Sequence, residues 1–162
     1  MSESASTAGK EEPTFMAVSR KNPDMRSAHA KAAATIPRFI EHTRSDVAGF
    51  RSAKLRFRDP DESERLGEDR FLFLWLTGVR YHAEEKIFSG TFFEVPSEFQ
   101  KWHKVGDRLG FDPEDIFDWM MLTEDGRLFG GYTLRVSRAL LPEDKRSDYD
   151  KHIGVRVYEE EA

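Results

Sequence analysis

The residues best placed to do chemistry lie on one stretch of the chain, where Asp118 stands among apolar side chains. Ile116 and Met120 are two positions before and after it, so an extended strand would put all three on one face. A carboxylate on such an apolar wall has a raised pKa and could act as a general acid or base. Arg135 could pair with Asp118 or clamp an anionic ligand through its guanidinium. We favour the structural alternatives, in which Asp118 accepts backbone hydrogen bonds from a turn and Arg135 forms a salt bridge.

Acidic residues also gather just before this stretch, at Asp112, Glu114 and Asp115. Together with Asp118 they could bind a cation, but a calcium loop needs a glycine at its sixth position and this segment has none. The five histidines form no HxxxH or HExxH pair, and we expect His103 to lie in an exposed loop. We therefore expect no metal site and no cofactor.

Basic residues alternate along one predicted strand, at Lys54, Arg56 and Arg58. With nearby aromatic residues they could hold RNA on a small barrel. The alternative is a solvated face whose charges prevent pairing at a sheet edge. The chain has 25 Lys and Arg against 30 Asp and Glu, a net charge of −5, which argues against nucleic acid because that affinity depends on neutralising phosphates.

Aromatic residues are concentrated in the middle of the chain, since most of the 13 Phe and 3 Trp residues lie between positions 71 and 132. Most of them must belong to the core. An exposed remainder would indicate binding to a protein or ligand. The candidates for such a binding surface are Trp75, Trp102, Trp119 and Tyr132.

Composition predicts one globular domain in a chain of 162 residues, 38% of which are hydrophobic. The absence of cysteine excludes disulfides, thiolate zinc sites, iron–sulfur clusters and cysteine nucleophiles. The N-terminus has no apolar signal-peptide core, and the longest strongly apolar run, residues 71–76, is far shorter than the roughly 20 residues of a membrane-spanning helix. We therefore expect a cytoplasmic protein.

The chain divides into three parts. Residues 1–22 have few apolar anchors and predict a disordered tail. Residues 23–142 are expected to form the single folded domain. Residues 143–162 carry seven acidic and four basic residues and predict an acidic tail, in which alternation around Val155 is compatible with an edge strand.

The domain is expected to begin with a helix, because apolar residues recur at spacings of three and four between positions 25 and 40. Asn22 or Asp24 can cap this helix. Pro37 either kinks it or begins a second short helix. Gly49 lies where a helix stop is expected.

Strand patterns follow. The predicted strands cover residues 53–58, 71–76, 87–93, 108–111, 116–122 and 127–129. We expect a charged loop from Asp59 to Asp69, and we expect the apolar run 71–76 to be a central strand covered on both faces. Residues 132–140 favour a short helix, with a last strand as the alternative. Together these elements predict an α+β fold, in which an N-terminal helix packs on a mostly antiparallel sheet that is either strongly bent or barrel-like. A short helix is expected near the end of the core.

Three segments in the second half carry a resemblance to a known family. They are Asp115-Ile116-Phe117-Asp118-Trp119-Met120, Asp125-Gly126-Arg127 and Gly131-Tyr132-Thr133-Leu134-Arg135. The chain resembles, over about residues 24–138, the bacterial domain-of-unknown-function 2314 family, also called YegJ-like proteins. The resemblance implies a compact bacterial α+β domain and no established activity.

No convergent catalytic set is visible, so we expect a non-catalytic protein-interaction or regulatory module, for example one that neutralises a toxin. The acidic end of the chain would supply electrostatic complementarity to a protein partner. The alternative is a small hydrolase or transferase that uses Asp118 as acid or base and Arg135 as anion clamp. RNA binding through the Lys54 strand is a third hypothesis.

Overall fold

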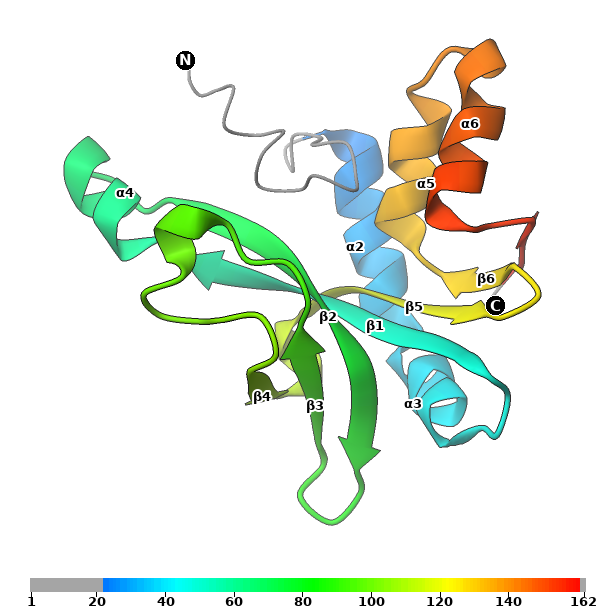
Figure 1. The fold of residues 1–162 in the computed structure, drawn as a ribbon, viewed down its shortest axis with the longest axis horizontal. Coiled ribbons are helices and arrows are strands. Elements are labelled where there is room, and N and C mark those ends of the chain that lie inside the picture. The colour runs from blue at the N-terminus through cyan, green and yellow to red at the C-terminus, as the bar shows by residue number, and fades with distance from the viewer. Residues whose placement is uncertain (1–21, 161–162) are drawn as a thin grey trace.

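The computed structural model describes residues 22–160 and gives them an α+β fold (Figure 1). In chain order the elements are α2 (Pro23–Ala34), α3 (Ile36–Arg44), β1 (Gly49–Arg58), α4 (Pro60–Leu66), β2 (Phe71–His82), β3 (Ile87–Phe92), η1 (Ser97–Phe99), β4 (Arg108–Phe111), η2 (Pro113–Asp115), β5 (Ile116–Thr123), β6 (Arg127–Gly130), α5 (Tyr132–Ala139), α6 (Glu143–Ile153) and β7 (Val157–Tyr158). The predicted fold class is confirmed. The tail predicted over residues 1–22 lies, apart from Asn22, outside the described residues.

The predicted N-terminal helix is two helices, because Pro37 lies in the first turn of a separate α3. Asn22 caps α2, and its side chain accepts the backbone N–H two residues on at 2.8 Å. The prediction that Gly49 stops the helix is wrong. Helix α3 ends at Arg44, and Gly49 is the first residue of β1.

The sheet has the strand order β4-β3-β2-β1-β5-β6-β7. Every neighbouring pair is antiparallel except β6 and β7, so the prediction of a mostly antiparallel sheet is confirmed. Strand β1 is central, and it pairs with β2 through residues 53–58 and with β5 through residues 49–55. This order places β4 and β7 at opposite ends of the sheet.

The sheet curls, because β4 and β5 are four strand positions apart but residues 112–115 alone connect them. Four positions of a flat sheet span about 19 Å. Residues 113–115 form a 3₁₀ turn, which advances only about 2 Å per residue and cannot bridge that distance. The curl brings β4 toward β1 and β5, yet no ladder joins β4 to either among residues 22–160, so the barrel stays open.

Strand β5 contains a β-bulge at Phe117, which changes the face of the sheet to which the residues on either side of it point. Lys54 pairs with Asp118 and Leu55 with Ile116, so Phe117 is an extra residue between them. Because adjacent residues of β1 point to opposite faces, Asp118 and Ile116 do so too. The expectation that Ile116 shares a face with Asp118 is therefore wrong.

The core lies on the inner face of the curled sheet, which we define as the face of Leu55. It is built from the buried side chains of Ala53, Leu55, Leu74, Leu76, Phe88, Phe92, Phe111, Ile116 and Trp119, with Ala28, Ala32 and Phe39 from the helices. The Phe39 ring stacks on Phe88 at 5.4 Å and on Trp119 at 5.1 Å. On the outer face of β2, Trp75 is buried but Phe71 and Phe73 are half-buried, so the predicted cover on both faces is present only in part.

Two helices occupy segments for which no helix is expected from the sequence. Helix α4 replaces most of the predicted charged loop, and Asp59 caps it by accepting the Glu62 N–H at 3.1 Å. Helix α6 lies within the segment predicted as an acidic tail. The helix favoured over residues 132–140 is confirmed as α5, and Figure 1 shows α2, α5 and α6 gathered beside the β5–β6 end of the sheet.

Candidate functional site

Asp118 is fully buried, and its carboxylate holds the beginning of α5. Its Oδ1 accepts the Trp119 N–H at 2.8 Å and the Tyr132 N–H at 3.2 Å. Its Oδ2 accepts the Thr133 N–H at 2.8 Å and the Thr133 hydroxyl at 2.5 Å. The N-cap residue of α5 is Gly131, which has no side chain, so the carboxylate from β5 does the capping.

The electrostatics of Asp118 follow from this burial. Burial raises the pKa of the Asp118 carboxyl, and the hydrogen bonds from Thr133 and the positive charge of Lys54 lower it in part. Lys54 is itself buried on the outer face, with its Nζ 5.8 to 5.9 Å from the ring centres of Phe73, Trp75 and Phe117. The carboxylate thus lies among donors of the fold and has no exposed surface.

Arg135 points away from Asp118 and binds three backbone carbonyls. Its Nε lies 2.9 Å from the Gly130 oxygen, and its Nη2 lies 3.3 Å from that of Leu128 and 2.7 Å from that of Glu159. Among residues 22–160 no contact joins Arg135 to Asp118. The structure therefore does not bring the two candidate catalytic residues to a common point.

The four aromatic candidates for binding differ in exposure. Trp75, Trp119 and Tyr132 are buried, and the Trp119 indole N–H donates to Thr35 Oγ1 at 3.0 Å within the core. Trp102 is 38% exposed. Of these four side chains, only that of Trp102 is exposed enough to contact another molecule.

The acidic and histidine candidates form no cluster. Within the described part of the chain, no three His, Asp or Glu side chains lie close enough together to hold a metal ion. Asp115 accepts the Asp112 N–H at 2.9 Å and so closes the turn before β5. His103, expected in an exposed position, is half-buried and stacks on Phe92 at 4.7 Å.

The basic strand residues have different environments. Lys54 is buried, Arg56 is exposed with its guanidinium 4.3 Å from the Phe71 ring centre, and Arg58 pairs with Asp69 at 3.0 Å. The alternation seen in the sequence places all three on the outer face, where Arg56 forms no ion pair with a carboxylate of residues 22–160.

A polar cluster that the sequence analysis missed joins β2, β3 and β4. His82 Nε2 lies 2.7 Å from Ser89 Oγ, and Arg108 donates to the same oxygen from Nε at 3.1 Å and Nη2 at 2.9 Å. With both acceptor positions taken by Arg108, the Ser89 hydroxyl donates to His82. Through these contacts the cluster joins three strands. Its only sequence signal is that His82 and Ser89 flank the turn between two strands.

Exposed apolar residues gather on the connection between β3 and β4. Phe93 is 39%, Trp102 38% and Val105 60% exposed, and we call these three the β3–β4 loop surface. Gly106 donates its N–H to the Phe92 oxygen at 2.8 Å, which puts Val105 beside Phe93. Buried Phe99, whose ring centre lies 5.4 Å from that of Trp102, anchors the turn that carries it.

A family model matches residues 22–157 of the chain. The family is DUF2314, described as an uncharacterized protein conserved in bacteria. The chain belongs to the DUF2314 family. No curated protein and no solved structure matches it.

The DUF2314 match includes every element from α2 to the first residue of β7. The Asp118 cap, the polar cluster at Ser89 and the β3–β4 loop surface all lie within it. The family resemblance seen in the sequence is thus confirmed, over a longer stretch than the segments that carried it. None of the helices among residues 22–160 has the length and apolar character needed to cross a bilayer.

Proposed function

We propose that this DUF2314 chain is a non-catalytic interaction module of the bacterial cytoplasm, which binds a partner protein through the β3–β4 loop surface. One observation carries the proposal: Phe93, Trp102 and Val105 are large, apolar and exposed on a single connection. Exposed apolar side chains that lie together are typical of protein-binding sites, and tryptophan is enriched among the residues that dominate binding energy.

The connection between β3 and β4, which carries this surface, is fixed by contacts to the core. Such fixing favours binding of a partner. His103 packs on Phe92 and lies 5.4 Å from the ring centres of both Phe57 and Phe99. Lys101 contacts the Trp102 ring and forms an ion pair with Asp61 of α4. A surface fixed in this way loses little conformational entropy on binding.

The environment of Asp118 and Arg135 supports this proposal over a hydrolase or transferase. A hydrolase built on these residues would need both side chains to face one substrate. Asp118 instead accepts four donors of the fold, and Arg135 binds backbone carbonyls. Neutralisation of a basic toxin is one form that the interaction could take, because Asp148 and Glu160 belong to an acid-rich C-terminal segment.

The test is affinity capture from a bacterial lysate followed by native mass spectrometry of the eluted complex. Wild-type protein should bring down one stoichiometric partner. Trp102→Ala should weaken its binding about tenfold or more, as expected for a central aromatic contact. Val47→Ser is the matched control. Val47 is 53% exposed, but it lies just before the first residue of β1, whereas Phe57, which contacts His103 of the loop, lies near the last. Repeated absence of a partner, or equal capture by both variants, would contradict the proposal.

A further inference from the structure

A cavity of about 460 Å³ opens where the curled sheet fails to close. Its walls come from α2, β1, β2, β4, η2 and β5 and include Arg56, Phe57, Phe73, Gly110, Phe111 and Phe117. This volume lies in the usual range of ligand-binding sites. The feature that identifies its ligand is the backbone of β4.

Strand β4 has one paired edge and one open edge. It pairs with β3, and no strand lies on its other side among residues 22–160. Phe92 donates its N–H to the Asp107 oxygen, and hydrogen-bonded positions alternate along an antiparallel ladder. Leu109 and Phe111 therefore bond toward β3, whereas the N–H and C=O of Gly110 point away from it.

The next outward-facing group is already occupied. Asp112 donates its N–H to the Asp115 carboxylate, which closes the chain after β4. Gly110 thus presents the open edge that lines the cavity. An extended peptide can add to such an edge as a further strand, bonded through its main chain.

The walls specify the side chains of such a peptide. Leu55, Phe57, Leu109 and Phe111 form an apolar wall on the inner face. Arg56 lies on the opposite, outer face, is exposed, and forms no ion pair with a described carboxylate. Because strand side chains alternate, a bound segment would turn apolar residues inward and polar residues toward Arg56.

We propose that β4 accepts an extended segment of a partner protein as an added strand, with apolar residues inward at alternate positions and an acidic residue facing Arg56. This site is separate from the β3–β4 loop surface, and the inference does not rest on binding there. Glu114 and Asp115 are both exposed on the η2 side of the cavity. Their negative charges disfavour a second acidic residue of the bound segment at that end, and this limits the direction in which the segment binds.

The probe is a heptapeptide with valine at alternate positions, one central glutamate and serine at the other two positions, titrated to millimolar concentration into isotope-labelled full-length protein and followed by amide NMR. The Gly110 amide signal should shift, and its hydrogen exchange should slow. A matched peptide with lysine in place of glutamate should bind at least about fivefold more weakly, since it meets Arg56 with a like charge.

Two variants at Gly110 isolate the main-chain contact. Gly110→Pro removes the N–H that would bond to the peptide, and an edge strand tolerates proline where its N–H points outward. Gly110→Ala keeps the N–H, and an added Cβ would be 3.6 Å from Ile87, an ordinary contact. We expect binding to weaken at least about fivefold in the proline variant and to be retained in the alanine variant.

Arg56→Glu provides a second test that does not depend on how the proline variant folds. It should reverse the preference, so that the lysine peptide binds more tightly than the glutamate peptide. No change at Gly110 with either peptide, or an unaltered preference in Arg56→Glu, would overturn the proposal. A concentration-dependent dimer that Gly110→Pro abolishes, without peptide binding, would also overturn it and assign the edge to a second copy of this chain.

Discussion

Asp118 of β5 accepts two hydrogen bonds from Thr133 of α5 at one carboxylate oxygen. The Thr133 N–H donates at 2.8 Å and its hydroxyl donates at 2.5 Å. Both residues are buried, so these bonds have no competition from water. They connect the middle of the sheet to the helix that follows it across 15 residues. The segment that resembles a catalytic strand in the sequence is thus a strand that caps a helix.

Replacement of Asp118 should therefore destabilise the fold. Asp118→Ala leaves the first N–H groups of α5 without acceptors, and we expect a loss of about 3 kcal/mol in the free energy of unfolding. Asp118→Asn should lose somewhat less, since its amide keeps one oxygen but turns a donor toward Thr133. Urea unfolding followed by circular dichroism measures both.

Wild type and Asp118→Asn should also differ in how their free energy of unfolding depends on pH. Burial raises the pKa of Asp118 in the folded protein above the value of about 4 expected for the unfolded chain. The folded state then binds a proton more readily, so the contribution of Asp118 is fully present below about pH 4 and is lost as pH rises through its folded pKa. The stability advantage of wild type over Asp118→Asn should shrink as pH rises above 4. An advantage that grows with pH would contradict this prediction.

How much of this site could be predicted from sequence depends on one residue. The apolar run from Ile116 to Leu122 predicts a strand, and the strand is present. The bulge at Phe117 has no local signal, because it is set by how β1 and β5 align over their whole length. Without the bulge, Asp118 would share a face with Ile116 and lie on an apolar wall. With it, Asp118 faces outward from the core and meets α5.

The missed helices have a different cause. Helix α6 has few apolar residues, and Tyr149 is its buried side chain, so its periodicity is too weak to detect. Helix α4 spans only Pro60–Leu66, and its clearest signal is the Asp59 cap. Each helix also has a polar contact with another part of the fold, Asp61 of α4 with Lys101 and Asp150 of α6 with Arg138, which composition alone does not reveal.

Another prediction concerns Thr35, which joins the two N-terminal helices to the core. Its hydroxyl accepts the Trp119 indole N–H at 3.0 Å and donates to the Lys31 oxygen at 2.8 Å. Thr35→Val keeps the shape but leaves the buried indole N–H without its acceptor, so we expect a loss of about 2 kcal/mol. Thr35→Ser keeps the hydroxyl and should lose less than half as much. Equal losses would indicate that the methyl group, and not the hydrogen bond, matters.

A further prediction compares two glycines with positive φ. Gly130 has φ +70°, and an added Cβ would lie 2.5 Å from the Trp119 oxygen and 2.7 Å from its ring. Gly67 has φ +71°, with nothing within 4 Å of an added Cβ. Gly67→Ala should lose about 1 kcal/mol from backbone strain alone, whereas Gly130→Ala should lose about 3 kcal/mol or more because backbone and a packed ring block it. Thermal unfolding of both variants in one buffer tests the difference.

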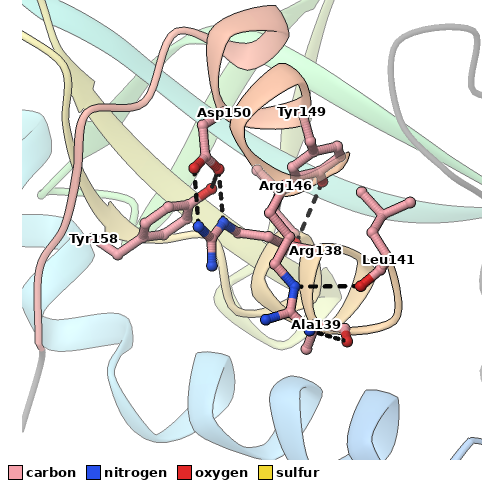
Figure 2. A network of polar contacts seen from close by, with 8 residues as sticks. Arg138, Ala139, Leu141, Arg146, Tyr149, Asp150 and Tyr158 are labelled. Atoms are coloured by element: carbon pink, nitrogen blue, oxygen red, sulfur yellow. Dashed lines mark hydrogen bonds and ion pairs between the residues drawn. The ribbon is translucent and has the colours of Figure 1, made fainter. Parts of the chain in front are cut away.

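The last prediction concerns the contact that holds α6 against α5 (Figure 2). Arg138 donates two hydrogen bonds to the Asp150 carboxylate, from Nε to Oδ1 at 2.7 Å and from Nη2 to Oδ2 at 3.0 Å. The Tyr158 hydroxyl donates to Oδ1 of the same carboxylate at 2.5 Å. Burial raises the pKa of Asp150, but the bonds from Arg138 and Tyr158 outweigh it and hold the pKa below its usual value. The stabilisation is therefore present above about pH 4 and is lost as pH falls through the folded pKa.

Asp150→Asn should accordingly lose about 1.5 kcal/mol at pH 7 and show less loss of stability than wild type on acidification below pH 4. Tyr158→Phe removes one donor and should lose about 1 kcal/mol. Amide hydrogen exchange should report faster opening of α6 in Asp150→Asn, with the β1–β2 ladder unchanged, because α6 packs on α5 and not on that ladder. Faster exchange throughout the sheet would instead show that α6 is part of the same cooperative unit as the core.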